Sequence, residues 1–196
     1  KKYFQVKKKI LHLDLDSGWS HWDWVCFQKP VILSVWYLLR IMLFKNGLNS
    51  TYGDTAVNGI GQIGGAIDLD NTSVVTFNNC EFLNNESTIY TGGALAITQN
   101  GTKATFNSCL FDGNKSTKNG GAVFIGNAGA TFDKCTFVRN KTTANGGGAI
   151  YFNNDARNNT LTIKNSVFGG ASADYANSAA AGGAALLLCN GKKVTV

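Results

Sequence analysis

Three cysteines recur in one sequence motif, and they are the first residues of this chain that could do chemistry. Cys80, Cys109 and Cys135 lie 29 and 26 residues apart, each within a segment of the form Phe-x-x-Cys-x-Phe. Converging thiols can bind a metal, but a closed coordination shell needs further ligands, and residues 48–196 contain no histidine. Parallel strands in register would hold these side chains about 4.8 Å apart, wider than the ~3.8 Å between bridged Cβ atoms. We therefore predict a column of buried thiols, with no metal and no cofactor; disulfides between adjacent coils remain the alternative.

Two aspartates, Asp68 and Asp70, are the candidates for acid–base catalysis, because residues two apart share one face of a strand. Hydrolysis of a glycosidic bond needs a pair of carboxylates. The equivalent positions in the next two copies of the repeat hold Ala96 with Thr98 and Phe124 with Gly126. No carboxylate cluster extends across the copies, so we predict that the chain is not an enzyme and has no catalytic residue. The alternative is a carbohydrate-active protein, a polysaccharide lyase or hydrolase, whose catalytic residues lie outside this sequence.

A column of apolar residues indicates binding instead of catalysis. The middle residue of the strand that follows each Gly-Gly-Ala motif is, in order, Asp68, Ala96, Phe124, Tyr151 and Leu186. Aromatic residues exposed in a row can bind a partner or a sugar, because contiguous apolar surface patches usually have a function. We predict that Phe124, Tyr151 and Leu186 form a binding ladder, unless bends of the chain or a neighbouring domain cover this face.

A repeat of two alternating motifs positions these residues. Gly-Gly-Ala begins at residues 64, 92, 120, 147 and 182, in steps of 28, 28, 27 and 35 residues. The cysteine motif lies between successive copies of Gly-Gly-Ala. Its fourth copy, IKNSVFGGA from Ile163, has Ser166 in place of the cysteine and ends at Ala171, where the other three copies end in asparagine. Glycine accepts positive φ, so we expect sharp corners at Gly64-Gly65, Gly92-Gly93, Gly120-Gly121 and Gly147-Gly148. A second recurrent corner is expected at Asn85, Asn114 and Asn140, since asparagine also tolerates this conformation.

Each repeat contains three short runs of alternating apolar residues, which is the period of a β-strand. Stacking one repeat on the next pairs equivalent strands about 4.8 Å apart and produces columns of like side chains, one of them Phe77, Phe106 and Phe132. The sequence therefore predicts an all-β protein, a right-handed parallel β-helix of about four to five coils and three sheets, over residues 48–196. The last residues, NGKKVTV, align with NGTKATF from Asn100. We expect the sequence to end within a coil, at its second strand, and further coils to follow.

Residues 1–47 have a different composition from the rest. They contain all four Trp and both His of the chain. They also contain eight Lys or Arg and three Asp, so they carry +5 of the net charge of +6. The apolar run at 31–44 is interrupted by Arg40 and falls short of the ~20 residues of a membrane-spanning helix. A signal anchor, a helix capping the β-helix and non-native sequence remain alternatives, and membrane attachment is expected only through residues 31–44. Because the rest of the chain is almost neutral, we expect no nucleic-acid partner.

The alternation of Gly-Gly-Ala with Phe-x-x-Asn resembles the repeat of the chlamydial polymorphic outer-membrane proteins. Phe-x-x-Asn occurs as Phe82–Asn85, Phe111–Asn114 and Phe137–Asn140, and the resemblance covers residues 60–196. It implies a secreted or surface-displayed β-helix used as an adhesin, often as the passenger of an autotransporter. The location implied is extracellular or at the cell surface, in the outer membrane if the source is bacterial. The implied partner is a protein or glycan on a host or neighbouring cell.

Seven asparagines stand in Asn-x-Ser/Thr triplets, the acceptor sequence for N-glycosylation in a eukaryotic secretory pathway. They are Asn49, Asn71, Asn85, Asn100, Asn114, Asn140 and Asn158. A chain rich in Asn, Ser and Thr generates such triplets readily, and three of them contain the predicted corner asparagines. A structural role is therefore the favoured interpretation for those three.

Overall fold

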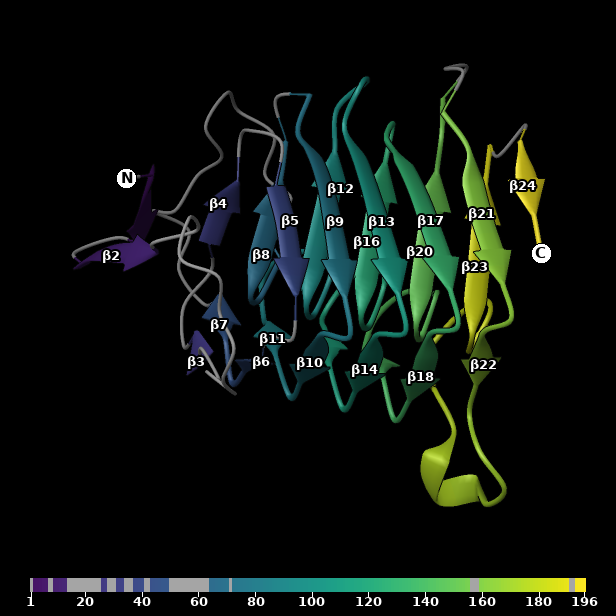
Figure 1. Ribbon diagram of the computed structural model, residues 1–196. Coiled ribbons are helices and arrows are strands. Elements are labelled where there is room, and N and C mark those ends of the chain that lie inside the picture. The colour runs from purple at the N-terminus through teal and green to yellow at the C-terminus, as the bar shows by residue number, and fades with distance from the viewer. Residues whose placement is uncertain are drawn as a thin grey trace.

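The computed structural model describes residues 2–6, 9–13, 26–27, 31–33, 37–40, 43–49, 64–70, 72–155, 159–190 and 193–196, with side chains from residue 43 onward except at 48–49. The chain winds into stacked coils, and equivalent strands of successive coils pair in parallel and in register (Figure 1). This arrangement is an all-β parallel β-solenoid of about four turns, as the alternating apolar residues predict.

Four parallel sheets run along the solenoid, and each is named here by its first strand after residue 64. The β8 sheet contains β4 (Val31–Leu33), β8 (Ile67–Leu69), β12 (Leu95–Thr98), β16 (Val123–Gly126), β20 (Ile150–Asn153) and β23 (Leu186–Cys189). The β9 sheet contains β5 (Tyr37–Arg40), β9 (Val74–Asn78), β13 (Lys103–Asn107), β17 (Gly129–Asp133), β21 (Leu161–Lys164) and β24 (Val194–Thr195). The β10 sheet contains β3 (Cys26–Phe27), β6 (Leu43–Lys45), β10 (Glu81–Leu83), β14 (Leu110–Asp112), β18 (Thr136–Val138) and β22 (Val167–Phe168). The short β11 sheet contains β7 (Leu48–Asn49), β11 (Glu86–Ser87), β15 (Lys115–Ser116) and β19 (Lys141–Thr142).

The β11 sheet differs from the expectation of three sheets. Its strands follow the Phe-x-x-Asn motif and are two residues long. Two residues are too few to produce a recognisable alternation of apolar and polar side chains, so the sequence pattern does not reveal them. The chain also contains an antiparallel hairpin, β1 (Lys2–Val6) with β2 (Lys9–Leu13), and a 3-10 turn, η1 (Ala173–Tyr175).

The sheets continue across the change in composition at residue 47. The apolar run at 31–44 contains β4, β5 and part of β6, which pair in parallel with β8, β9 and β10. Phe44 stacks on Phe82 with ring centroids 4.9 Å apart, so it extends the same aromatic column as the later coils. Among the residues that the structure describes, no helix is long and apolar enough to cross a membrane.

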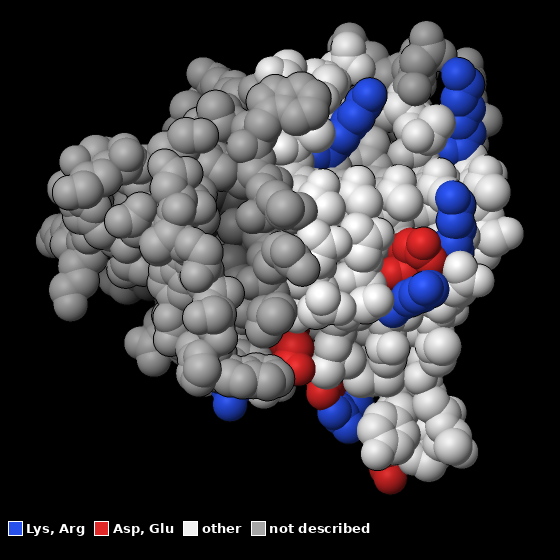
Figure 2. Space-filling view, viewed as in Figure 1, with Lys and Arg blue, Asp and Glu red and all other residues white. Residues whose placement is uncertain are grey.

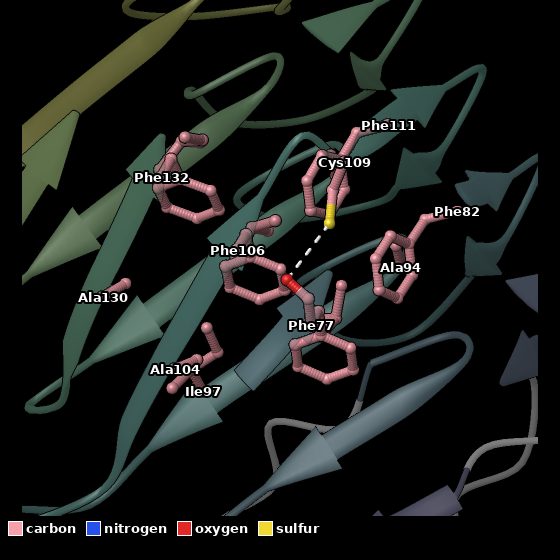
Figure 3. Packing of buried hydrophobic residues seen from close by; sticks show 14 of the residues in the cluster. Phe77, Phe82, Ala94, Ile97, Ala104, Phe106, Cys109, Phe111, Ala130 and Phe132 are labelled. Carbon is pink, nitrogen blue, oxygen red and sulfur yellow. Dashed lines mark hydrogen bonds between the residues drawn. The ribbon is translucent and has the colours of Figure 1, made fainter. Parts of the chain in front are cut away.

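The core consists of two columns of phenylalanine rings that meet inside the solenoid (Figure 3). On the β9 sheet the rings of Phe77, Phe106 and Phe132 stack at centroid distances of 4.8 Å, which confirms the predicted column. The second column, on the β10 sheet, contains Phe44, Phe82, Phe111, Phe137 and Phe168. Rings of the two columns meet edge to face, for example Phe106 and Phe111 at 5.4 Å, which is a favourable geometry for aromatic pairs.

The glycine pairs stand at corners for two separate reasons. Gly120 has a φ of 65°, a conformation that glycine adopts without strain. Gly121 is required by packing, because a Cβ atom there would lie 2.0 Å from the backbone oxygen of Gly148 in the next coil. Positive φ was also expected at the corner asparagines, and this expectation is wrong. The residue before each of them has positive φ instead: Asn84, Gly113 and Arg139.

Candidate functional site

The column predicted to bind a partner is aligned as expected but is largely buried. Asp68, Ala96, Phe124 and Tyr151 are paired residue by residue across β8, β12, β16 and β20. The rings of Phe124 and Tyr151 stack with centroids 5.5 Å apart. However, Ala96 is fully buried, Phe124 is 4% exposed and only Tyr151 is half-buried. This face therefore offers little contact area to a partner.

Leu186 is not part of this column. It pairs with Ile150, whose side chain faces the core, and it packs against the core itself, whereas Leu187 pairs with Tyr151. The amide of Ile150 donates to the carbonyl oxygen of Ala185, so Ala185 takes the place that alignment on Gly-Gly-Ala gives to Ala184. A shift of one residue moves every side chain of a strand to the opposite face. The strand is thus preceded by one alanine more than in the earlier copies. The sequence does not show this shift, because Ala184 and Ala185 are both alanine.

Tyr151 is the member of the column with a polar group near solvent. Burial, followed by a hydrogen bond with the thiol of Cys189, raises the pKa of Tyr151 to about 12. The phenol therefore remains protonated at neutral pH and can donate a hydrogen bond. It offers a donor, not a charge, at the margin of the buried face.

The cysteines form the column of thiols that their spacing predicts. Cys80, Cys109 and Cys135 are buried thiols that form no disulfide bond. The Cys109 thiol lies 3.6 Å from the carbonyl oxygen of Phe77 (Figure 3). Hydrogen bonds with the thiols of Cys135 and Cys80, followed by burial, raise the pKa of Cys109, which disfavours the reactive thiolate. Within the described ranges, no cluster of His, Cys, Asp or Glu has the arrangement of a metal site.

The repeated asparagines form a ladder of buried amides. The side-chain nitrogen Nδ2 of Asn114 donates to Oδ1 of Asn140 at 2.9 Å and to the carbonyl oxygen of Phe82 at 2.9 Å. Oδ1 of Asn114 accepts from both Nδ2 and the backbone N–H of Asn85. Asn140 repeats the arrangement with Asn177, a residue that the sequence analysis missed. The 35-residue step carries this asparagine nine residues beyond Phe168 instead of three, which hides it from a fixed-spacing search.

Burial of this ladder separates the acceptor triplets into two groups. Asn85, Asn114 and Asn140 are fully buried, with their side-chain amides bonded inside the solenoid, so they are structural in the folded protein. Asn100 is exposed at a bend. The triplets at Asn49, Asn71 and Asn158 lie outside the residues whose side chains are described.

The aspartate pair on β8 is closed off from solvent. Asp68 is 6% exposed and Asp70 is 4% exposed. Among the residues that the structure describes, Oδ1 of Asp68 has no hydrogen-bond partner. Burial, followed by repulsion from Asp70, raises the pKa of the Asp68 carboxyl well above its usual range. A substrate would have no direct access to these carboxyls in this arrangement.

Replacing Asp68 with asparagine should remove a pH dependence of stability. The folded protein holds the Asp68 proton more tightly than the unfolded chain does. The free energy of unfolding therefore falls as the pH rises above about 3.9, the pKa of aspartate in the unfolded chain. It stops falling once the pH exceeds the raised pKa of the folded state. Urea unfolding at several pH values should show D68N gaining stability relative to the original protein between about pH 4 and pH 7. Asp174→Asn at an exposed position is the control. A gain of the same size in both variants would assign the effect to net charge.

The 35-residue step forms a segment that projects away from the coils beyond β22, at residues 169–181 (Figure 1). It contains η1 and Tyr175, which is 43% exposed. The guanidinium of Arg139 lies over the Tyr175 ring, 5.1 Å from its centroid, and the Arg139 amide donates to the Tyr175 carbonyl oxygen at 3.2 Å. Arg139 also forms an ion pair with Asp112, which orients it. The segment therefore presents an aromatic ring and a fixed cation side by side.

A pocket of about 390 Å³ lies at the end of this segment. It is lined by Lys141, Thr142, Thr143, Ser178, Ala179 and Ala180. Ser178 also forms a parallel bridge with Lys141, so the returning chain joins the β11 sheet there. The repeat pattern does not predict this site, although the longer step before Gly182 indicates an insertion at the surface.

No family model, curated protein or solved structure matches this chain. The described geometry therefore defines a parallel β-solenoid and no narrower family. The resemblance to the chlamydial repeats depends on the Gly-Gly-Ala and Phe-x-x-Asn motifs alone.

Proposed function

We propose that this protein is a non-enzymatic β-helix repeat protein, secreted or displayed at the cell surface, that serves adhesion by binding a protein or glycan of another cell. The relation to the chlamydial polymorphic outer-membrane repeats is part of the same proposal. Support for that relation comes from the two motifs, which recur at equivalent places in successive coils. Extracellular location follows from this relation.

The observation that carries the proposal is the projecting segment at residues 169–181. Binding energy at protein surfaces concentrates in a few residues, among which Tyr and Arg are enriched. Tyr175 and Arg139 are such a pair, and the ion pair between Arg139 and Asp112 holds the cation in place before any partner arrives. Ordering them on binding therefore costs little conformational entropy. The adjacent pocket adds the ammonium of Lys141 and hydroxyl groups for polar contacts.

Replacing Tyr175 with serine tests this site. We expect Y175S to weaken binding to a glycan microarray or to cultured epithelial cells by about tenfold or more, since the tyrosine supplies most of the apolar contact. The circular dichroism spectrum should stay unchanged, because Tyr175 lies outside the core. Val167→Ser, at another exposed apolar residue, is the matched control and should bind normally. Equal binding by Y175S and the original protein would refute the proposed site.

A further inference from the structure

Five threonines occupy one register on the outer face of the β9 sheet. Thr76, Thr105, Thr131, Thr162 and Thr195 are paired in sequence across β9, β13, β17, β21 and β24. The first four residues are half-buried and the last is exposed, so the column lies on the surface of the sheet. Five successive strands therefore hold a threonine in one register, and we name this array the threonine column; the strand before them, β5, has Leu38 in this register.

The spacing of this array is fixed by the sheet beneath it. Parallel strands lie about 4.8 Å apart, and a β-branched side chain has few χ1 rotamers, so hydroxyl and methyl groups repeat at that distance. The inward neighbours of Thr76, Thr105 and Thr131 report the same repeat, because their phenylalanine rings stack 4.8 Å apart. Alongside the column, Nδ2 of Asn107 donates to Oδ1 of Asn78 at 2.8 Å. This bond joins β9 and β13 beside the first two threonines, and the same register continues as Asp133 and Lys164.

The centre of this face carries no charge. Figure 2 shows an uncharged area over the middle of the β9 sheet with charged side chains at its margins. Those at the strand ends are Lys103, Asp133 and Lys164. The outward positions of the described part of β9, β13 and β17 hold no aromatic residue. The threonine column is thus an uncharged array of hydroxyl and methyl groups, with Asn78 and Asn107 beside its first two members. The charged residues Asp133 and Lys164 lie beside the next two members, Thr131 and Thr162.

The chemistry of this face favours one class of ligand over two others. A protein partner gains most of its binding energy from aromatic and arginine anchors, and the face has none at its centre. A soluble glycan has no aromatic ring here on which to stack. Ordered water fits, because each threonine hydroxyl can hold one water molecule and the neighbouring methyl group supports the surrounding water network. Ice is the uncharged solid whose oxygen atoms repeat along one axis at nearly the strand spacing.

We propose that the threonine column binds ice. Waters held at equal intervals along the column merge with the oxygen lattice at an ice surface. The entropy cost of immobilising those waters is small, because the rigid threonines already localise them in the free protein. This activity uses a different face from the Tyr175 segment, so it can succeed or fail independently of adhesion to cells.

A test compares ice adsorption by variants of the full chain. Fluorescently labelled protein is applied to a single ice crystal, and thermal hysteresis is measured in the same samples. We expect the original protein to label ice. The double variant Thr105→Tyr with Thr131→Tyr should lose labelling, because its tyrosine rings keep the ice surface away from the column. Thr136→Tyr is the matched control, since Thr136 is a half-buried outward threonine of the β10 sheet. Y175S should label ice normally.

Each outcome decides the proposal. The proposal is supported if the original protein and Thr136→Tyr label ice and the double variant does not, while the double variant keeps an unchanged β-sheet spectrum. Absence of labelling by the folded original protein overturns it. Labelling that persists in the double variant overturns the assignment to this column. Binding of the original protein to a glycan microarray that depends on Thr131, without labelling of ice, would replace ice by a sugar.

Discussion

Replacing Phe106 with alanine is expected to lower the free energy of unfolding by about 3–5 kcal/mol. Phe106 is fully buried in a middle coil, with the rings of Phe77 and Phe132 stacked 4.8 Å away on either side. The ring of Phe111 meets it edge to face at 5.4 Å. Its removal leaves a cavity that the hydrogen-bonded coils above and below cannot close, because their spacing is set by the backbone. Both aromatic columns lose contacts at once.

Urea unfolding followed by circular dichroism measures this cost. Lys115→Ala in the same coil is the control, because its side chain is 47% exposed and its ion pair with Glu86 is at the surface. Surface substitutions of this kind change stability by less than about 0.5 kcal/mol. Similar losses in both variants would mean that the core is not where the structure places it.

The sequence predicts the solenoid because its core repeats at fixed intervals. Phe77, Phe106 and Phe132 occur at equivalent places in three copies, and two-residue alternation around them is the period of a strand. Corners were predicted at the glycine pairs for the same reason. The physical basis differed for Gly121, which is required by a backbone oxygen of the next coil and not by its own φ. Conformational preferences of single residues do not predict contacts between coils.

The sequence predicts the candidate binding site less well than the fold. The site depends on which strand faces are buried in the folded chain and on a segment inserted into the repeat. Alternation places Phe124 on the outer side of a strand, yet the folded chain leaves it 4% exposed. The projecting segment with Tyr175 falls in the irregular 35-residue step, where no periodic rule applies. The threonine column has a signal in the sequence, because a threonine precedes Phe77, Phe106, Phe132, Ile163 and Val196. The alternation that predicts the core depends only on the inward residues, so it assigns no role to the threonines between them.

Replacing Asn114 with aspartate is expected to destabilise the protein by about 3–5 kcal/mol at neutral pH, although the two side chains have the same shape. Nδ2 of Asn114 donates two hydrogen bonds, to Phe82 and Asn140, and a carboxylate can donate neither. The variant would therefore bury a charge against two acceptor oxygens. Only the bonds that Oδ1 accepts from Asn85 would remain.

The pH dependence of this loss distinguishes the amide ladder from simple packing. Burial raises the pKa of the introduced carboxyl in the folded state, so the folded variant gains stability as the pH falls through that value. A protonated carboxyl also regains one donor. Urea unfolding of N114D should therefore show a smaller deficit relative to the original protein near pH 4 than near pH 7. The control is Asn100→Asp at an exposed bend, where the side-chain oxygen accepts from Asn159 and a carboxylate can do the same. A deficit that is equal at both pH values would contradict the donor role assigned to Asn114, since loss of shape alone does not titrate.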